Sequence, residues 1–173
     1  MSGAAASGRR AGLVLFGGLT AVAFVLRAAQ VLLMSDLAVN PHWLHPVMDA
    51  AVYDSMARGL LEGTWPPASA PFFAAPLYPY LLAGLYAVFG TDQQLPVLLV
   101  HALVSATGAG FAGLIAARLF GRPTGWLAGA LHAISWTSIF FAAELLAVSI
   151  TVPLLPAALW LLSRSAPLGD APG

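Results

Sequence analysis

The sequence predicts an all-α, polytopic membrane protein, and two features of its composition indicate this class. Hydrophobic residues make up 60% of the 173-residue chain and charged residues only 8%, whereas a soluble domain is about 25% charged. The apolar residues also gather into runs that are long enough to cross ~30 Å of hydrocarbon as helices. We therefore expect about four transmembrane helices, together with an external first loop that carries an amphipathic helix and a short interfacial helix.

The charge balance and the cysteine content exclude several classes of function. The formal net charge is zero, so the sequence predicts no nucleic-acid partner. Because the chain contains no cysteine, disulfides, cysteine-ligated zinc and thiol catalysis are excluded. The sequence also lacks the nucleophile elbow of α/β-hydrolases, the zinc-protease signature and the P-loop.

The first predicted span covers residues 13–34. Arg9 and Arg10 precede this apolar run, and such basic residues hold the start of a span in the cytoplasm. The run is longer than the apolar core of a cleaved signal peptide, so we expect an uncleaved helix with a cytoplasmic N-terminus. Arg27 lies within it, and we expect its side chain to snorkel outward or to pair with a later carboxylate.

An amphipathic helix is predicted from about residue 46 to Gly63, because glycine commonly ends helices. Asp54, Arg58 and Glu62 follow one another at four-residue spacing, which places them on one helix face, where they neutralise one another. Such surface pairs contribute only about 0.3–0.5 kcal/mol each, so we expect replacement of Asp54 to cost little.

Asp49 falls on the opposite, mostly apolar face of this helix, beside Tyr53. No cation lies nearby in the helix, and an unanswered carboxylate on an apolar face is costly. We expect either a function for Asp49 or a partner from elsewhere in the fold. A second interpretation is that Asp49 only caps the helix, since aspartate is a favoured N-cap residue.

The remaining elements follow from proline, glycine and hydropathy. Residues 64–75 are proline-rich and predict a loop against the bilayer surface, with Trp65, Phe72 and Phe73 at the interface. The apolar stretch 76–90 is too short for a full span and predicts an interfacial or re-entrant helix. Further spans are predicted at residues 95–120, at 126–141 and at 148–162, the last of them interrupted by Pro153 and Pro156.

The distribution of charge supports this arrangement. If residues 76–90 do not span the membrane, all basic loops fall on the cytoplasmic side, as the positive-inside rule requires. The acidic residues then fall outside: Asp36, Asp49, Asp54, Glu62, Asp92 and Glu144. We treat residues 1–165 as a single membrane-embedded domain and 166–173 as a flexible tail, and we expect a multi-pass protein of the bacterial inner membrane.

Two external carboxylates, those of Asp49 and Glu144, border the predicted spans without a local cation. Such groups suit general-base catalysis or the binding of a divalent cation. His42 and His45 lie just upstream and could bind phosphate, ligate a metal or relay a proton. Each of these residues also has a structural interpretation, as a helix-end carboxylate at the headgroups or as a polar loop residue.

The order of these motifs resembles the beginning of the polytopic glycosyltransferases with the GT-C fold, in particular the glycosyltransferase family 39 group of protein mannosyltransferases and aminoarabinose transferases. A membrane helix precedes an external aspartate with a tyrosine four residues later, and a proline-rich apolar segment ending in Phe-Gly follows. The matching residues are Asp49, Tyr53, Ala57, Gly63, Pro76, Leu77, Tyr78, Pro79, Phe89 and Gly90, and the run 117–122 resembles the cytoplasmic turn of that family.

The resemblance implies transfer of a sugar from a polyprenyl-phosphate donor to an external acceptor, with inversion at the anomeric carbon. Asp49 matches the catalytic aspartate of the first loop, as general base, and Glu144 stands where relatives carry a second external acid, which supports catalysis or binds a divalent cation. We assign substrate contacts to Tyr53, Tyr78 and the two histidines, and we expect membrane lipids to surround the spans.

The chain departs from the resembled family in two respects. That family has about a dozen spans, and it often carries a basic donor-phosphate contact where this chain has Ala75. We therefore expect an N-terminal module, a truncated product or half of a split enzyme, which would need a downstream or separate polytopic partner. The alternatives are a non-catalytic polytopic subunit or degenerate fragment that assembles with another membrane protein, and half of a transporter in which Arg27 pairs with Glu144.

Overall fold

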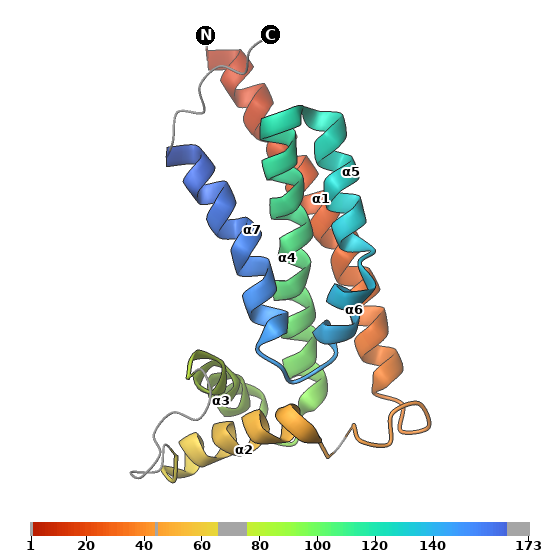
Figure 1. The fold of residues 1–173 in the computed structure, drawn as a ribbon, viewed down its shortest axis with the longest axis vertical. Helices are drawn as coiled ribbons and strands as arrows, with labels where there is room; N and C mark the ends of the chain where they lie inside the picture. Colours follow the sequence, from red (N-terminus) through yellow and green to blue (C-terminus); the bar gives the residue numbers. More distant parts are fainter. Residues whose placement is uncertain (1, 44, 66–75, 166–173) are drawn as a thin grey trace.

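The computed structural model describes residues 2–43, 45–65 and 76–165, and within these ranges all regular structure is helical (Figure 1). The helices are α1 (Ser2–Met34), α2 (Met48–Glu62), α3 (Leu77–Phe89), α4 (Gln94–Phe120), α5 (Arg122–Ala133), α6 (Trp136–Ala142) and α7 (Val148–Ser165). Among them α1, α4 and α7 are apolar and long enough to cross a membrane. The predicted all-α class is confirmed.

Helix α4 forms the centre of the bundle, and α1, α5 and α7 pack around it (Figure 1). Its small residues allow this close packing. A methyl group added at Gly110 would lie 2.6 Å from the Phe16 ring, and one added at Gly125 would lie 2.7 Å from the carbonyl oxygen of Gly113. The backbones of neighbouring helices therefore approach each other directly, as small residues permit in membrane bundles.

Residues 126–141 do not form the one continuous helix that was predicted, because the structure divides this segment into two helices. Helix α5 ends at Ala133 and α6 begins at Trp136. The two short helices run one after the other alongside α4 (Figure 1). The run is mostly apolar, with polar residues only at His132, Ser135, Thr137 and Ser138, so its overall hydropathy gave no sign of the break.

Arg27 explains how a break can exist inside the bundle. Its side chain is fully buried, and its guanidinium donates hydrogen bonds to the carbonyl oxygens of Ala133 at 3.2 Å and of His132 at 3.5 Å. It also donates to the hydroxyl of Ser105 at 3.0 Å. Arg27 therefore neither snorkels outward nor pairs with Glu144, and both expectations for this residue were wrong.

Helix α7 continues through Pro153 and Pro156, so the predicted interruption of this span was also wrong. Pro153 is buried against α4, where a methyl group added at Gly108 would lie 3.3 Å from its Cβ. Prolines are tolerated in membrane helices where neighbouring groups accommodate the altered backbone. The glycine opposite Pro153 leaves room for the ring.

Helices α2 and α3 lie across one end of the bundle (Figure 1). The expected end of α2 is confirmed, because Gly63 adopts a left-handed conformation with φ of 73° and its N–H contacts the last turn. Helix α3 has 13 residues, which is too short for a full span. The predicted surface loop with Phe72 and Phe73 and the predicted tail at 166–173 lie outside the described residues.

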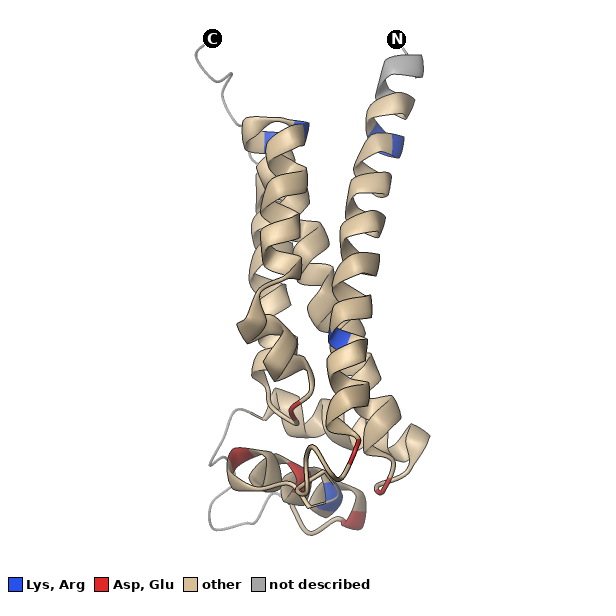
Figure 2. Cartoon of the chain, turned by 90° about the vertical axis from the view of Figure 1, so that its right-hand side faces the viewer, with Lys and Arg blue, Asp and Glu red and all other residues tan. Residues whose placement is uncertain are grey.

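The two ends of the described bundle carry opposite charge (Figure 2). The basic end holds the arginines near the start of α1, around the α4–α5 turn and at the end of α7, which are Arg9, Arg10, Arg118, Arg122 and Arg164. The acidic end holds α2, α3 and the described aspartates and glutamates. This separation is what the positive-inside rule predicts for a membrane protein of this shape.

Because the native chain contains no cysteine, single cysteines can test which end faces the cytoplasm. We expect a cysteine at Glu62 or Gln93 to react with a membrane-impermeant maleimide in intact cells or right-side-out vesicles. A cysteine at Arg122 should react only after permeabilisation. Cytoplasmic labelling at Gln93 would contradict both the surface position of α3 and the external position of Glu144.

Candidate functional site

A cavity of about 230 Å³ lies at the acidic end, between the bundle and the α2–α3 layer. Its walls come from the segment that follows α1, the beginning of α2, the beginning of α4 and the segment that joins α6 to α7. The lining residues are Asn40, His42, Trp43, Pro46, Val47, Ala50, Gln94, Leu98, Ala143, Glu144 and Leu145. The cavity therefore combines apolar walls with a few polar groups, as ligand sites commonly do.

Short-range hydrogen bonds shape the cavity wall that follows α1. The backbone N–H of His42 donates to the side-chain oxygen of Asn40 at 3.1 Å, and that of Ala38 donates to the Asp36 carboxylate at 2.9 Å. Asparagine and aspartate stabilise turns in this way. Trp43 then inserts its side chain into the core and is only 8% exposed, which fixes the segment against the bundle.

Glu144 is the carboxylate of this cavity. It is half-buried between Ala143 and Leu145, both of which are buried. Burial disfavours the charged form of a carboxyl group, and it raises the pKa of Glu144 above its ordinary value of 4.5. A carboxyl group in such a position can hold or exchange a proton nearer to neutral pH than an exposed glutamate can.

Two buried polar residues support the segment that carries Glu144 from inside the bundle. The ring of His101 approaches the backbone of Glu144 and lies 3.4 Å from the Ser149 hydroxyl. That hydroxyl donates to the carbonyl oxygen of Leu146 at 2.7 Å. His101 therefore has a hydrogen-bonding role inside the bundle.

Asp49 does not line the cavity, although Val47 and Ala50 on either side of it do. Its side chain is exposed, so the apolar surroundings expected for it are not found. The capping interpretation is also wrong, because the N-cap of α2 is Val47. Asp49 instead lies in the first helical turn, where a negative charge is favourable near the helix N-terminus. The preceding Met48 has a φ of 55°, a conformation that costs a non-glycine residue free energy.

The four residues predicted to contact substrate occupy different positions. His42 lines the cavity, whereas His45 is exposed outside it. Tyr53 and Tyr78 pack edge-to-face with their ring centroids 4.9 Å apart. Tyr78 is only 3% exposed, and its buried hydroxyl has no hydrogen-bond partner within the described chain. The tyrosine pair thus forms part of the packing between α2, α3 and α4.

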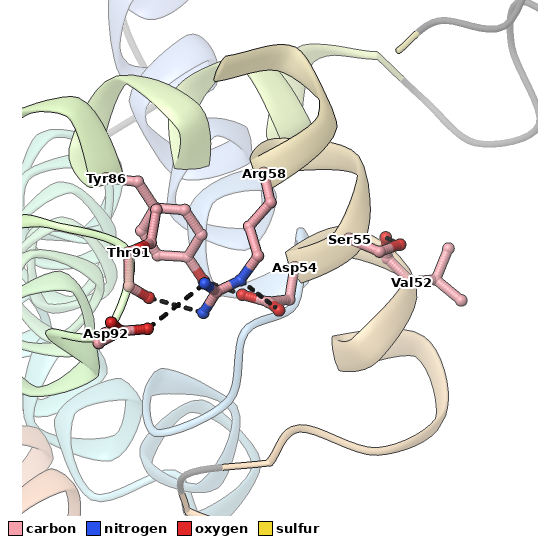
Figure 3. Close-up of polar contacts among 7 residues, drawn as sticks. All are labelled: Val52, Asp54, Ser55, Arg58, Tyr86, Thr91 and Asp92. Atoms are coloured by element: carbon pink, nitrogen blue, oxygen red, sulfur yellow. Dashed lines mark hydrogen bonds and ion pairs between the residues drawn. The ribbon is translucent and has the colours of Figure 1, made fainter. Parts of the chain in front are cut away.

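Arg58 links α2 to α3 through a polar cluster that the sequence predicted only in part (Figure 3). Its predicted pairing with Asp54 is confirmed at 2.9 Å, but the Asp54 side chain is only 15% exposed, so the expectation of a weak surface pair that is cheap to replace was wrong. Glu62, the third member of the predicted stripe, is exposed and forms no ion pair within the described residues. Besides Asp54, Arg58 donates a hydrogen bond to the carbonyl oxygen of Thr91 at 2.7 Å and approaches the Asp92 carboxylate at 3.4 Å.

Tyr86 completes this cluster and was missed by sequence reasoning. Burial raises the pKa of its hydroxyl, which therefore stays protonated and donates a hydrogen bond to the Asp54 carboxylate (Figure 3). The signal that could have found it is its spacing from Tyr78 and Leu82. All three lie four residues apart and are buried on one face of α3.

The described residues contain no group of three or more histidine, aspartate or glutamate side chains that could hold a metal ion. Glu144 and Asp49, the two predicted metal ligands, do not line the same cavity. A full set of protein ligands for a divalent cation is therefore not formed in this part of the chain.

Comparison with known families finds a match over residues 71–168 to the family described as dolichyl-phosphate-mannose-protein mannosyltransferase. The match covers more than half of the 173 residues. The chain belongs to this family. The matched range includes α3, the bundle from α4 to α7, and Glu144, whereas Asp49 and the two histidines lie before it. No curated protein and no solved structure was found to match the chain.

Membership confirms the resemblance to GT-C-type glycosyltransferases that the motif order indicated. At a general level the family makes this chain a membrane glycosyltransferase module, and it implies a lipid-linked sugar as donor. The three long apolar helices agree with a membrane protein. In this family member the cavity with Glu144 lies at the acidic end of the bundle, next to the ends of its spans.

We expect Tyr86→Phe to loosen the contact between α2 and α3, because the Asp54 carboxylate loses a partly buried hydrogen bond. Hydrogen bonds to charged groups contribute roughly 1.5–3 kcal/mol, so hydrogen exchange of α2 amides should accelerate by about tenfold or more. Tyr80→Phe is the matched control, since Tyr80 is half exposed and forms no hydrogen bond to α2. Equal exchange in the two variants would show that the cluster in Figure 3 does not hold the layer together.

The raised pKa of Glu144 predicts a pH dependence of stability. A folded-state pKa above the unfolded value means that Glu144 contributes stability below about pH 4.5, and that this contribution is lost as pH rises through the raised pKa. We therefore expect Glu144→Gln to have a higher melting temperature than the native chain at pH 7, with the difference disappearing towards pH 4. Glu62→Gln, at an exposed position, should show no such trend. If the higher melting temperature of Glu144→Gln did not change with pH, the raised pKa of Glu144 would be contradicted.

Proposed function

We propose that this chain forms the first part of the transfer site of an integral-membrane glycosyltransferase. In this proposal a sugar moves from a polyprenyl-phosphate donor to an acceptor at the acidic end, with inversion at the anomeric carbon. The observation that supports it most directly is the half-buried Glu144 in a cavity next to the ends of the spans. A lipid-linked donor presents its phosphate and sugar at this depth, because its chain stays in the hydrocarbon.

Asp49 is proposed as the general base. Its exposed carboxylate has no hydrogen-bond partner among the described residues, and its neighbours Val47 and Ala50 line the cavity. In the reaction an acceptor hydroxyl gives its proton to the carboxylate while its oxygen bonds to the anomeric carbon. The bond from that carbon to the donor phosphate breaks, and polyprenyl phosphate leaves. Attack opposite the leaving group produces the inversion. The position of the Asp49 carboxylate in the free protein does not have to match its position in the complex with substrates.

Glu144 is proposed to orient the acceptor by hydrogen bonding. The carboxylate of Glu144 accepts hydrogen bonds from hydroxyl groups, and its protonated form, which burial favours, can also donate one. A divalent cation fits this proposal only if one carboxylate and the donor phosphate share it, an arrangement that Mg²⁺ commonly takes. The described residues alone form no complete ligand set for such a cation.

The orientation and the partner of the module follow from charge and exposure. We propose a cytoplasmic N-terminus in a bacterial inner membrane, because five of the seven arginines lie at the end where α1 begins. In the candidate spans of α1 and α7 only 22% and 11% of the residues are buried. These apolar faces are available to membrane lipids and to further spans of a downstream or separate polytopic partner.

Turnover with polyprenyl-phosphate sugars, measured in the complete active protein, tests the assignment of roles. General bases contribute about 10²–10⁴-fold to rate, so Asp49→Asn should lower kcat by at least that order while membrane insertion survives. Glu144→Gln should cost less or change the dependence on divalent cations. Glu62→Gln serves as the control at an exposed position of the same layer. Loss of turnover in Glu144→Gln alone would reverse the two roles, and activity in both variants would favour a non-catalytic subunit.

A further inference from the structure

A groove opens at the basic end of the bundle, far from the cavity that holds Glu144. Helices α1 and α7 both pack against α4 but make at most marginal contact with each other. The space between them forms two adjoining hollows of about 820 Å³ and 360 Å³. Both hollows are bordered by Gly12, Leu114 and Trp160, one residue from each of the three helices. The larger hollow has the volume typical of a ligand site, ~300–1,000 Å³.

The interior of the larger hollow is apolar and aromatic. Phe16 of α1 and Phe111 of α4 meet there with their ring centroids 5.0 Å apart, and Phe111 also contacts Trp160 of α7 at 5.7 Å. The hollow runs from these rings towards the basic end, along Leu13. Such a surface, open along the side of a membrane bundle, suits a hydrocarbon chain.

Four arginines border the two hollows. Arg9 and Arg164 line the larger one, and Arg118, Arg122 and Arg164 line the smaller one. None of the four forms an ion pair with a described carboxylate, and the described acids lie at the opposite end of the bundle (Figure 2). The Arg164 guanidinium lies 4.9 Å above the Trp160 ring, a cation–π contact that holds this charge over the groove.

We propose that this groove binds one anionic glycerophospholipid of the leaflet at the basic end. The lipid phosphate lies among Arg9, Arg164 and the two arginines of the α4–α5 turn, and one acyl chain follows the apolar hollow towards Phe16. Charge complementarity selects this occupant, because basic pockets between membrane helices bind anionic headgroups. A further transmembrane helix would fill the apolar part but would leave the arginines unanswered.

The chain offers matched variants for a test of this site. The double variant Arg9→Gln with Arg164→Gln removes two charges of the groove. Arg10→Gln is the control, because Arg10 is an equally exposed neighbour that lines neither hollow. Gly12→Leu keeps every charge and fills the apolar groove, where a methyl group at Gly12 has only an ordinary contact with Leu114 at 3.8 Å.

Native mass spectrometry of the purified full chain, supplied with equal amounts of phosphatidylglycerol and phosphatidylcholine, measures the binding. We expect the native chain to retain one phosphatidylglycerol in preference to phosphatidylcholine. Removing each arginine charge of the groove should weaken phosphatidylglycerol retention roughly fivefold. The double variant should therefore lose more than tenfold in retention, and Arg10→Gln should lose little. Gly12→Leu should lose retention without any change in charge, and melting temperatures of all variants confirm that they are folded.

Several outcomes would overturn the proposal. Equal retention of the two lipids by the native chain, a comparison that needs no variant, would show that no anionic headgroup is recognised. An equal loss in Arg10→Gln and in the double variant would mean that the arginines attract lipid diffusely. Unchanged retention in Gly12→Leu would exclude the groove as the place of the acyl chain, and cross-linking of a second polypeptide to Trp160 would identify a protein occupant instead.

Discussion

The fold depends on the burial of Arg27. A charged side chain at membrane depth is costly, and it persists where polar groups of the protein surround it. Here the break between α5 and α6 leaves carbonyl oxygens at the end of α5, and the guanidinium of α1 binds those of Ala133 and His132. The negative end of the α5 dipole favours the same cation. The break and the buried arginine therefore stabilise each other, and Ser105 ties both to α4.

This arrangement determines where the chain approaches the site. Helix α6 has seven residues and ends towards the acidic end (Figure 1), where the chain turns into α7 through the segment that contains Glu144. His101 of α4 and Ser149 of α7 hold that segment from inside the bundle. Packing inside the bundle thus positions the half-buried carboxyl group of Glu144. The pair of His101 and Ser149 supports the segment that carries it.

Sequence reasoning predicted what local chemistry decides and missed what packing decides. The spans α1 and α4 follow from hydropathy, and the end of α2 follows from Gly63. The break after Ala133 depends on Arg27, which lies about a hundred residues earlier in the chain, so no local pattern indicates it. Pro153 remains helical because a glycine of α4 makes room for it. In the site, the position of Glu144 was predicted, whereas the exposure of Asp49 depends on how α2 meets the bundle.

The walls of the cavity come from two units, the α2–α3 layer and the bundle. Helices α2 and α3 contact each other more extensively than they contact the bundle, and the polar cluster around Arg58 fastens them into one unit. Val47 and Ala50 line the cavity from this unit, while Gln94 and Glu144 line it from the bundle. A ligand that contacts both walls holds the two units together, so its binding raises the stability of their docked arrangement.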